Sequence, residues 1–199
     1  MLRGVILALG GVFLAQSAFN QGAFAQMPAG DPAAGRKKAN MCRTCHGIEG
    51  LAKIPIAPNI GGEPASYITR QLIAFRSGAR THEMMSVVAK SLDDQTIADV
   101  AAWYALQKAA ASLPAGKTDA QAPETCVACH GAEGIATMED APNLAGETVM
   151  YLDTQLKAFR GGKRTHEIMS DIAADLSDDD IRTLAEWYSG IKLKIEKAK

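Results

Sequence analysis

The pattern Cys-x-x-Cys-His occurs twice in this chain, as CRTCH starting at Cys42 and as CVACH starting at Cys126, 84 residues later. In this pattern, two thiols form thioether bonds to a haem and the adjacent imidazole ligates the haem iron. The sequence therefore predicts two covalently bound haem c groups. Because the two copies use all four cysteines of the chain, none remains for a disulfide.

Paired cysteines also occur in zinc sites and in redox dithiols. A four-cysteine zinc site would join pairs that are far apart in the sequence and would leave both motif histidines unused. A thioredoxin-like dithiol would require a βαβ pattern, which the sequence lacks. We therefore expect haem attachment, with these residues: Cys42, Cys45 and His46 for haem 1, and Cys126, Cys129 and His130 for haem 2.

Residues 1–25 have the composition of an export signal. Arg3 supplies a positive start, residues 5–15 form a short apolar run, and Ala-Phe-Ala at 23–25 fits the small-x-small cleavage rule. The run is too short for a membrane span, so we expect a mature periplasmic chain, residues 26–199, with no transmembrane anchor after cleavage. An uncleaved signal that acts as an anchor is the alternative.

The mature chain is a tandem repeat. Shifting residues 42–104 by 84 positions gives identity at roughly half of them, without a gap. We expect domain 1 at 26–111, a linker at 112–122 and domain 2 at 123–199. A core of this size is marginal without a covalent or metal staple, so the haem-free chain is expected not to fold stably.

The pattern within each copy is helical. Asp31 and Pro32 are typical of a helix start, and Tyr67 to Ser77 has a helical pattern that ends at Gly78. The last helix of each copy has an apolar stripe and a cap signal; the residues are Ile97, Val100, Ala101 and Tyr104 with Asp93 or Ser91 as cap, and Ile181, Leu184, Ala185 and Tyr188 with a Ser177–Asp180 capping box. No strand alternation of useful length appears, so the predicted fold class is all-α.

The repeat also selects candidates for the second iron ligand. A methionine thioether is the usual partner of histidine in c-type electron carriers. Met85 and Met169 occupy matching positions, whereas Met84 matches Ile168. Met138 and Met150 have no methionine counterpart either. We therefore expect Met85 to ligate iron 1 and Met169 to ligate iron 2.

Other chemically active side chains also repeat. His82 and His166 are either alternative iron ligands or loop residues beside the haem edge; we favour the loop, because each lies only three residues from its methionine. Candidates to line the haems or to bind their propionates, with helix packing or surface exposure as the alternative, are Tyr67, Tyr151, Trp103, Trp187, Arg76, Arg80, Arg160 and Arg164.

The two halves differ in charge. Residues 26–115 carry ten basic and seven acidic side chains, a net charge of +3, whereas residues 116–199 carry ten basic and fifteen acidic ones, a net charge of −5. Complementary charge steers encounters between redox proteins, so electrons are expected to enter through one domain and leave through the other. Ordinary solubility charge is the alternative. Nothing indicates nucleic-acid binding.

The sequence resembles the dihaem cytochrome c4 family. The resemblance covers the mature chain and depends on both haem motifs, the methionine loops and these further segments: Pro-Asn at 58–59 and 142–143, Tyr-x3-Gln-Leu-x2-Phe-Arg-x-Gly from Tyr67 and from Tyr151, and Leu-Ser-Asp-Asp-Asp-Ile at 176–181. It implies two tandem class I cytochrome c domains, each wrapped around one haem, with the haem edges facing across the interface. It also implies His–Met ligation by His46 and Met85 and by His130 and Met169, with the Pro58 and Pro142 carbonyls orienting the histidines.

The start of the second half departs from the family pattern. The family's first helix carries a small residue against the last helix, and Gly35 fits this position in domain 1. The equivalent residue in domain 2 is Asp119, and Pro123 interrupts the segment. We therefore expect a shortened first helix and a looser haem in domain 2.

The predicted function is transfer of single electrons between a dehydrogenase or quinol-oxidising donor and an oxidase or cytochrome acceptor. One alternative is a haem subunit of a larger oxidoreductase, similar to the cytochrome subunit of flavocytochrome c sulfide dehydrogenase. Another is a dihaem enzyme, such as a peroxidase, with one open iron; two complete ligand sets argue against it.

Overall fold

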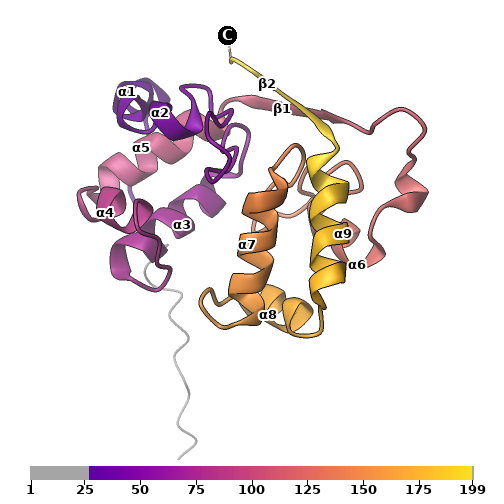
Figure 1. Cartoon of the computed structure of the whole chain (residues 1–199). Helices are drawn as coiled ribbons and strands as arrows, with labels where there is room; N and C mark the ends of the chain where they lie inside the picture. Colours follow the sequence, from indigo (N-terminus) through magenta and orange to yellow (C-terminus); the bar gives the residue numbers. More distant parts are fainter. Residues whose placement is uncertain (1–26, 199) are drawn as a thin grey trace, which may run out of the picture.

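The computed structural model describes residues 27–198, so the predicted signal peptide and its cleavage site lie outside the described residues. Two helical halves lie side by side, and a two-stranded ribbon crosses both of them (Figure 1). The predicted all-α class is confirmed as mainly helical. Within the described range, no helix combines the length and apolar character needed to cross a membrane.

Domain 1 is built from five α-helices and a 3-10 turn at Ala39–Met41. The helices are α1 (Pro32–Lys38), α2 (Arg43–His46), α3 (Ala65–Ser77), α4 (Met85–Lys90) and α5 (Asp94–Ala105). The Asp31 side chain caps α1 by accepting a hydrogen bond from the backbone N–H of Ala33, as predicted. A side chain at Gly35 would clash with the backbone of Asp99 in α5, which confirms the predicted need for a small residue there.

The central helices of domain 1 follow the sequence pattern closely. Helix α3 ends at Gly78, whose φ of 86° is in the left-handed region. Asp93, rather than Ser91, caps α5 by accepting from the N–H of Thr96. The predicted stripe on α5 is buried, with Ile97 and Tyr104 fully so, and it joins α5 to α3 in the core.

Domain 2 repeats this plan with four helices: α6 (Glu124–His130), α7 (Val149–Arg160), α8 (Glu167–Ala174) and α9 (Asp178–Ser189). A single 3-10 turn at Asp119–Gln121 stands where domain 1 has α1, and Pro123 directly precedes α6. The predicted shortening of the first helix is therefore confirmed.

Domain 2 is also less completely hydrogen bonded. Trp103 Nε1 donates to the Ile48 carbonyl at 2.7 Å and the Tyr104 hydroxyl donates to the Gly47 carbonyl at 3.2 Å. Among the described residues, the equivalent groups of Trp187 and Tyr188 are buried without a partner. A buried polar group without a partner costs about 1–3 kcal/mol, so these groups contribute less to the stability of domain 2 than their counterparts contribute to domain 1.

The ribbon was missed by the sequence prediction. Strands β1 (Lys108–Ser112) and β2 (Lys192–Glu196) pair antiparallel, with Ala110 opposite its repeat counterpart Lys194. Each strand has only five residues and pairs with the other copy. Lys192–Glu196 (KLKIE) does alternate polar and apolar residues, a short strand signal that was overlooked, whereas Lys108–Ser112 (KAAAS) has no such alternation. The expected domain boundary at 111/112 falls within β1.

The ribbon passes directly over one glycine of each domain. A Cβ at Gly62 would lie 2.6 Å from that of Ala109, and one at Gly146 would lie 2.7 Å from that of Leu193. Both glycines also have positive φ, 78° and 65°, a conformation that other residues rarely adopt. The ribbon therefore fixes the loops that contain these glycines, and these loops form the interface between the domains.

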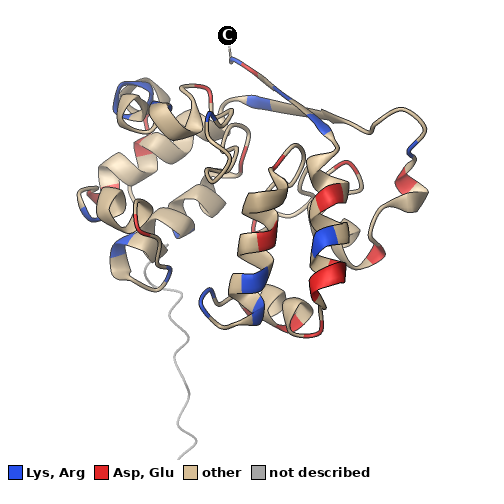
Figure 2. Cartoon of the chain, viewed as in Figure 1, with Lys and Arg blue, Asp and Glu red and all other residues tan. Residues whose placement is uncertain are grey.

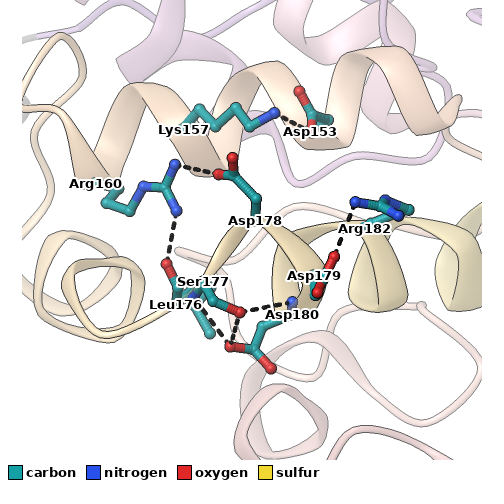
Figure 3. A network of polar contacts seen from close by, with 9 residues as sticks. All are labelled: Asp153, Lys157, Arg160, Leu176, Ser177, Asp178, Asp179, Asp180 and Arg182. Atoms are coloured by element: carbon teal, nitrogen blue, oxygen red, sulfur yellow. Dashed lines mark hydrogen bonds and ion pairs between the residues drawn. The ribbon is translucent and has the colours of Figure 1, made fainter.

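The cap of α9 gives a direct stability test. Ser177 and Asp180 form the predicted capping box, in which each side chain accepts from the other residue's backbone N–H (Figure 3). Replacing Ser177 by alanine is expected to lower the free energy of unfolding of domain 2 by about 1 kcal/mol, measured by urea unfolding of the holoprotein. Ser189→Ala, at the other end of α9, is the control, and an equal loss in both variants would contradict the capping role.

Candidate haem sites

The residues predicted to hold the two haems line one continuous cavity between the domains. They come from the start and body of α2 and from α4 in domain 1, and from α6 and α8 in domain 2; they are Cys42, which directly precedes α2, and Cys45, His46, Met85, Cys126, Cys129, His130 and Met169. The rest of the lining is mostly apolar and includes side chains of α3 and α7, which suits an apolar porphyrin plate.

The two motif histidines are held in the tautomer that an iron ligand needs. His46 Nδ1 donates to the Pro58 carbonyl at 2.9 Å, and His130 Nδ1 donates to the Pro142 carbonyl at 2.8 Å. The proton on Nδ1 leaves the Nε2 lone pair free. Burial lowers the pKa of both imidazoles and so favours the neutral form. The hydrogen bonds implied by the family resemblance are confirmed, and ligation of the irons remains a prediction.

The cysteines have the properties of attachment sites rather than of redox dithiols. Burial raises the pKa of the Cys42 thiol to about 11 and also raises that of Cys126. Reactive dithiols depend on a lowered pKa that yields the thiolate. The two pairs also belong to different domains, each beside its own histidine.

Met85 and Met169 are the least exposed of the methionines that line the cavity. Both are half-buried, whereas Met84, Met138 and Met150 are 60%, 48% and 54% exposed. Met85 also packs against the core cluster of domain 1. Partial burial beside the cavity fits a thioether that faces the haem, and it favours Met85 over its neighbour Met84.

His82 and His166 have a structural role that the sequence did not predict. His166 Nδ1 accepts from the backbone N–H groups of Ile168 and Met169, both at 3.3 Å. In return, the N–H of His166 donates to the Ser170 hydroxyl at 3.0 Å. His82 makes the same contacts at the start of α4. His166 is the N-cap of α8, whereas His82 lies two residues before the N-cap of α4. Both exposed histidines thus bind the backbone just ahead of the candidate methionines, which agrees with a loop position. The repeated His-x3-Ser spacing was the available signal.

The sequence and fold of this chain are similar to those of known proteins. The family model for cytochrome c oxidase, cbb3-type, subunit III matches residues 111–187. Cytochrome c4 of Pseudomonas aeruginosa is 33% identical over 180 residues, which cover 82% of this chain and 90% of that protein. The chain belongs to the cytochrome c4 family. It is therefore a dihaem c-type cytochrome that acts in electron transfer rather than as an enzyme.

Three further matches extend the comparison. The thiosulfate dehydrogenase electron acceptor of Stutzerimonas stutzeri is 33% identical over 176 residues, covering 78% of this chain and 81% of that protein. The crystal structure of reduced cytochrome c4 from Pseudomonas stutzeri matches with a TM-score of 0.70 at 30% identity, over 82% of this chain and all of that one. Thiosulfate dehydrogenase (TsdBA) from Marichromatium purpuratum matches with a TM-score of 0.68 at 29% identity, over 81% of this chain and 40% of that one.

The four predicted arginines divide into two pairs with different roles. Arg80 donates to Gln71 at 2.6 Å and, across the interface, to Gln155 at 2.7 Å. Arg164 donates to Gln155 in its own domain and to Gln71 across the interface. It also donates to Tyr67, at 3.1 Å. Both arginines line the cavity, together with Tyr67 and Tyr151.

Arg76 and Arg160 instead join helices within each domain. Arg160 donates to the Leu176 carbonyl at 2.7 Å and to Asp178 at 2.6 Å, which ties α7 to α9 (Figure 3). Arg76 makes the same pair of contacts in domain 1. Neither arginine is among the residues that line the cavity, so the structure favours a role in joining helices over the predicted contact with a haem.

The charge difference between the halves is visible at two helix ends (Figure 2). The last turn of α1 carries Arg36, Lys37 and Lys38, and the first turn of α9 carries Asp178, Asp179 and Asp180. These clusters lie in different domains, so the surface offers a basic and an acidic region to partners.

Proposed function

We propose that this protein carries single electrons in the periplasm, from a respiratory or dehydrogenase donor to a terminal oxidase or another acceptor. In this proposal His46 and Met85 ligate iron 1, and His130 and Met169 ligate iron 2. The observation that carries it is the single cavity lined by both ligand sets. With two axial ligands, each iron would have no free coordination position for a substrate. Such an arrangement suits electron relay between two haems beside one interface.

The haems, when bound, supply the Fe(III)/Fe(II) couple. The chain supplies the rest: Pro58 and Pro142 fix the imidazoles, and the two exposed histidines hold the starts of the methionine helices. A soft thioether favours Fe(II) and raises the potential. Apolar lining residues exclude water, which keeps the rearrangement that accompanies each electron transfer small.

Absorption spectroscopy of the oxidised protein tests the ligation. We expect the far-red methionine–iron band at the intensity of two haems, and no carbon monoxide binding after reduction. A band of half this intensity with rapid carbon monoxide binding would contradict closed His–Met ligation at both irons and would favour a dihaem enzyme with an open iron.

A second candidate function is that of a dedicated electron acceptor for one oxidoreductase. The similarity to a thiosulfate dehydrogenase electron acceptor favours it over a flavocytochrome-type partner. Reduction of the purified protein by a thiosulfate dehydrogenase with thiosulfate, at rates well above those with an unrelated dehydrogenase, would support this role. Co-purification with a flavoprotein would favour the sulfide dehydrogenase type instead.

A further inference from the structure

Two buried glutamates reach across the interface to the loop that holds the other domain's histidine. Glu147 of domain 2 accepts from the backbone N–H of Asn59, at 2.8 Å. Glu63 of domain 1 accepts from the backbone N–H of Asn143, at 3.0 Å to each of its oxygens. The two glutamates are equivalent in the repeat and are only 4% (Glu63) and 2% (Glu147) exposed.

These contacts act on the peptide groups that orient the histidines. The Asn59 N–H and the Pro58 C=O belong to one peptide group, and that C=O accepts from His46. The peptide group of Pro142 and Asn143 links Glu63 to His130 in the same way. Hydrogen bonds in such a chain polarise one another. A negative charge on either glutamate therefore makes the proline carbonyl of the same peptide group a stronger hydrogen-bond acceptor. The stronger bond increases the electron density on the imidazole that donates to it.

The side chains of Asn59 and Asn143 hold the two series of hydrogen bonds in place. Asn59 Nδ2 donates to the Gly146 carbonyl at 3.1 Å, while its Oδ1 accepts from the N–H of Ala52 at 3.0 Å. Asn143 donates to the Gly62 carbonyl at 3.1 Å in the mirrored arrangement. Each peptide group is therefore held by contacts to both domains. When the charge of the glutamate changes, the peptide group keeps its orientation and passes the effect on to the histidine.

We propose that Glu63 and Glu147 are crossed positioning residues, each of which sets the reduction potential of the haem in the other domain. Glu147 acts on haem 1 and Glu63 acts on haem 2. The inference rests on the proposed ligation of the irons by His46 and His130. Ligand basicity is tuned by the hydrogen bond on the far nitrogen, and a more basic imidazole stabilises Fe(III). The ionised glutamate therefore lowers the potential, and the protonated one lowers it less.

Protonation links this effect to pH. Burial raises the pKa of Glu63 to about 8 and that of Glu147 to about 9, and the charge of Glu63 adds to the shift at Glu147. The other ionisable groups facing this region are the phenols of Tyr67 and Tyr151 and the guanidinium groups of Arg80 and Arg164. Reduction removes one positive charge from the iron, so the reduced protein binds the proton more tightly. Each potential is expected to fall as the pH rises through the titration of its glutamate.

The test measures the two potentials separately between pH 6 and 10. A redox titration followed by NMR allows this, because the methyl signal of each axial methionine reports its own haem. In Glu147→Gln we expect haem 1 to lose its pH-dependent fall, while haem 2 keeps a fall whose midpoint shifts because the two carboxyl groups are coupled. Glu63→Gln should give the reverse. The proposal would be overturned if the pH-dependent fall disappeared at the haem of the domain that carries the substitution, or if the profiles of both haems were unchanged.

Two further variants separate tuning from a general effect on charge or folding. Glu133→Gln removes an exposed charge from domain 2 and should leave the shape of both profiles unchanged. Glu147→Asp keeps the charge but withdraws it from Asn59, so the fall at haem 1 should be smaller than in the wild type; a full-sized fall would count against the hydrogen-bond route. Failure of the proposed ligation would already appear in the wild-type methionine signals, before any glutamate variant is compared.

Discussion

Replacing Cys126 and Cys129 by alanine is expected to leave a protein with one haem whose second half is unfolded. Within the described residues, the buried core cluster of domain 2 contains Ala145, Leu152, Ala185, Tyr188 and Ile191, whereas that of domain 1 contains nine residues. Further apolar side chains of domain 2 line the cavity; they include Leu156, Phe159, Ile172 and Leu184. Without the haem, these side chains have no partner to pack against, and a half of this size lacks a sufficient core.

Limited proteolysis of the purified variant, with circular dichroism, measures this loss. We expect rapid cleavage within α7 to α9, residues 149–189, and a loss of the helical signal that domain 2 contributes. Acid–acetone extraction identifies any haem held without thioether bonds. The matched variant, with Cys42 and Cys45 replaced, should lose less structure, since α1 and the larger cluster remain. Protease resistance of residues 149–189 in the first variant would contradict the prediction.

The sequence predicted those parts of the fold that depend on near neighbours in the chain. The caps at Asp31, Asp93 and Ser177 each involve residues within three positions, and the α5 stripe repeats every helical turn. The haem motif is equally local, because both thiols and the imidazole lie within five residues. Such patterns require no knowledge of the rest of the molecule.

Features that depend on the placement of one copy against the other were not predictable in this way. The ribbon pairs Lys108 with Glu196, and the interface pairs Glu63 with Asn143. Both depend on an approximate two-fold relation that an internal repeat permits but does not specify. The sequence showed that Gly-Glu recurs at 62–63 and 146–147, but nothing in it showed that each glutamate contacts the opposite half.

The arginines show the same limit at a smaller scale. Arg76 and Arg80 are four residues apart and both repeat, yet only Arg80 reaches the interface. Arg76 lies on α3, whereas Arg80 lies just beyond Gly78, where the helix has ended and the chain has turned. The turn changes the direction of the side chain, and this direction follows from the three-dimensional path of the backbone.

Replacing Met85 by histidine is expected to lower the potential of haem 1 on the order of a few tenths of a volt, within the roughly 0.8 V range that axial ligands span. A second imidazole favours Fe(III), whereas the thioether favours Fe(II). Spectroelectrochemical titration measures the shift, and the far-red methionine–iron band should fall to half its intensity. Met84→His is the matched control because Met84 is the exposed neighbour on the same turn, so a larger effect there would contradict the assignment.

The equivalent change in domain 2, Met169→His, should lower the potential of haem 2 by a similar amount. Replacing each methionine by alanine should instead reveal a difference between the two domains. Met169→Ala opens iron 2 in domain 2. Among the described residues, this domain has no counterpart of α1, and the side-chain polar groups of its Trp187 and Tyr188 have no hydrogen-bond partner. Met85→Ala opens iron 1 in the half where the equivalent groups are bonded to the loop after the haem motif. Carbon monoxide should therefore bind the reduced Met169→Ala protein faster than the Met85→Ala protein, as measured by flash photolysis. Equal rates would mean that the missing helix and hydrogen bonds do not loosen the second haem.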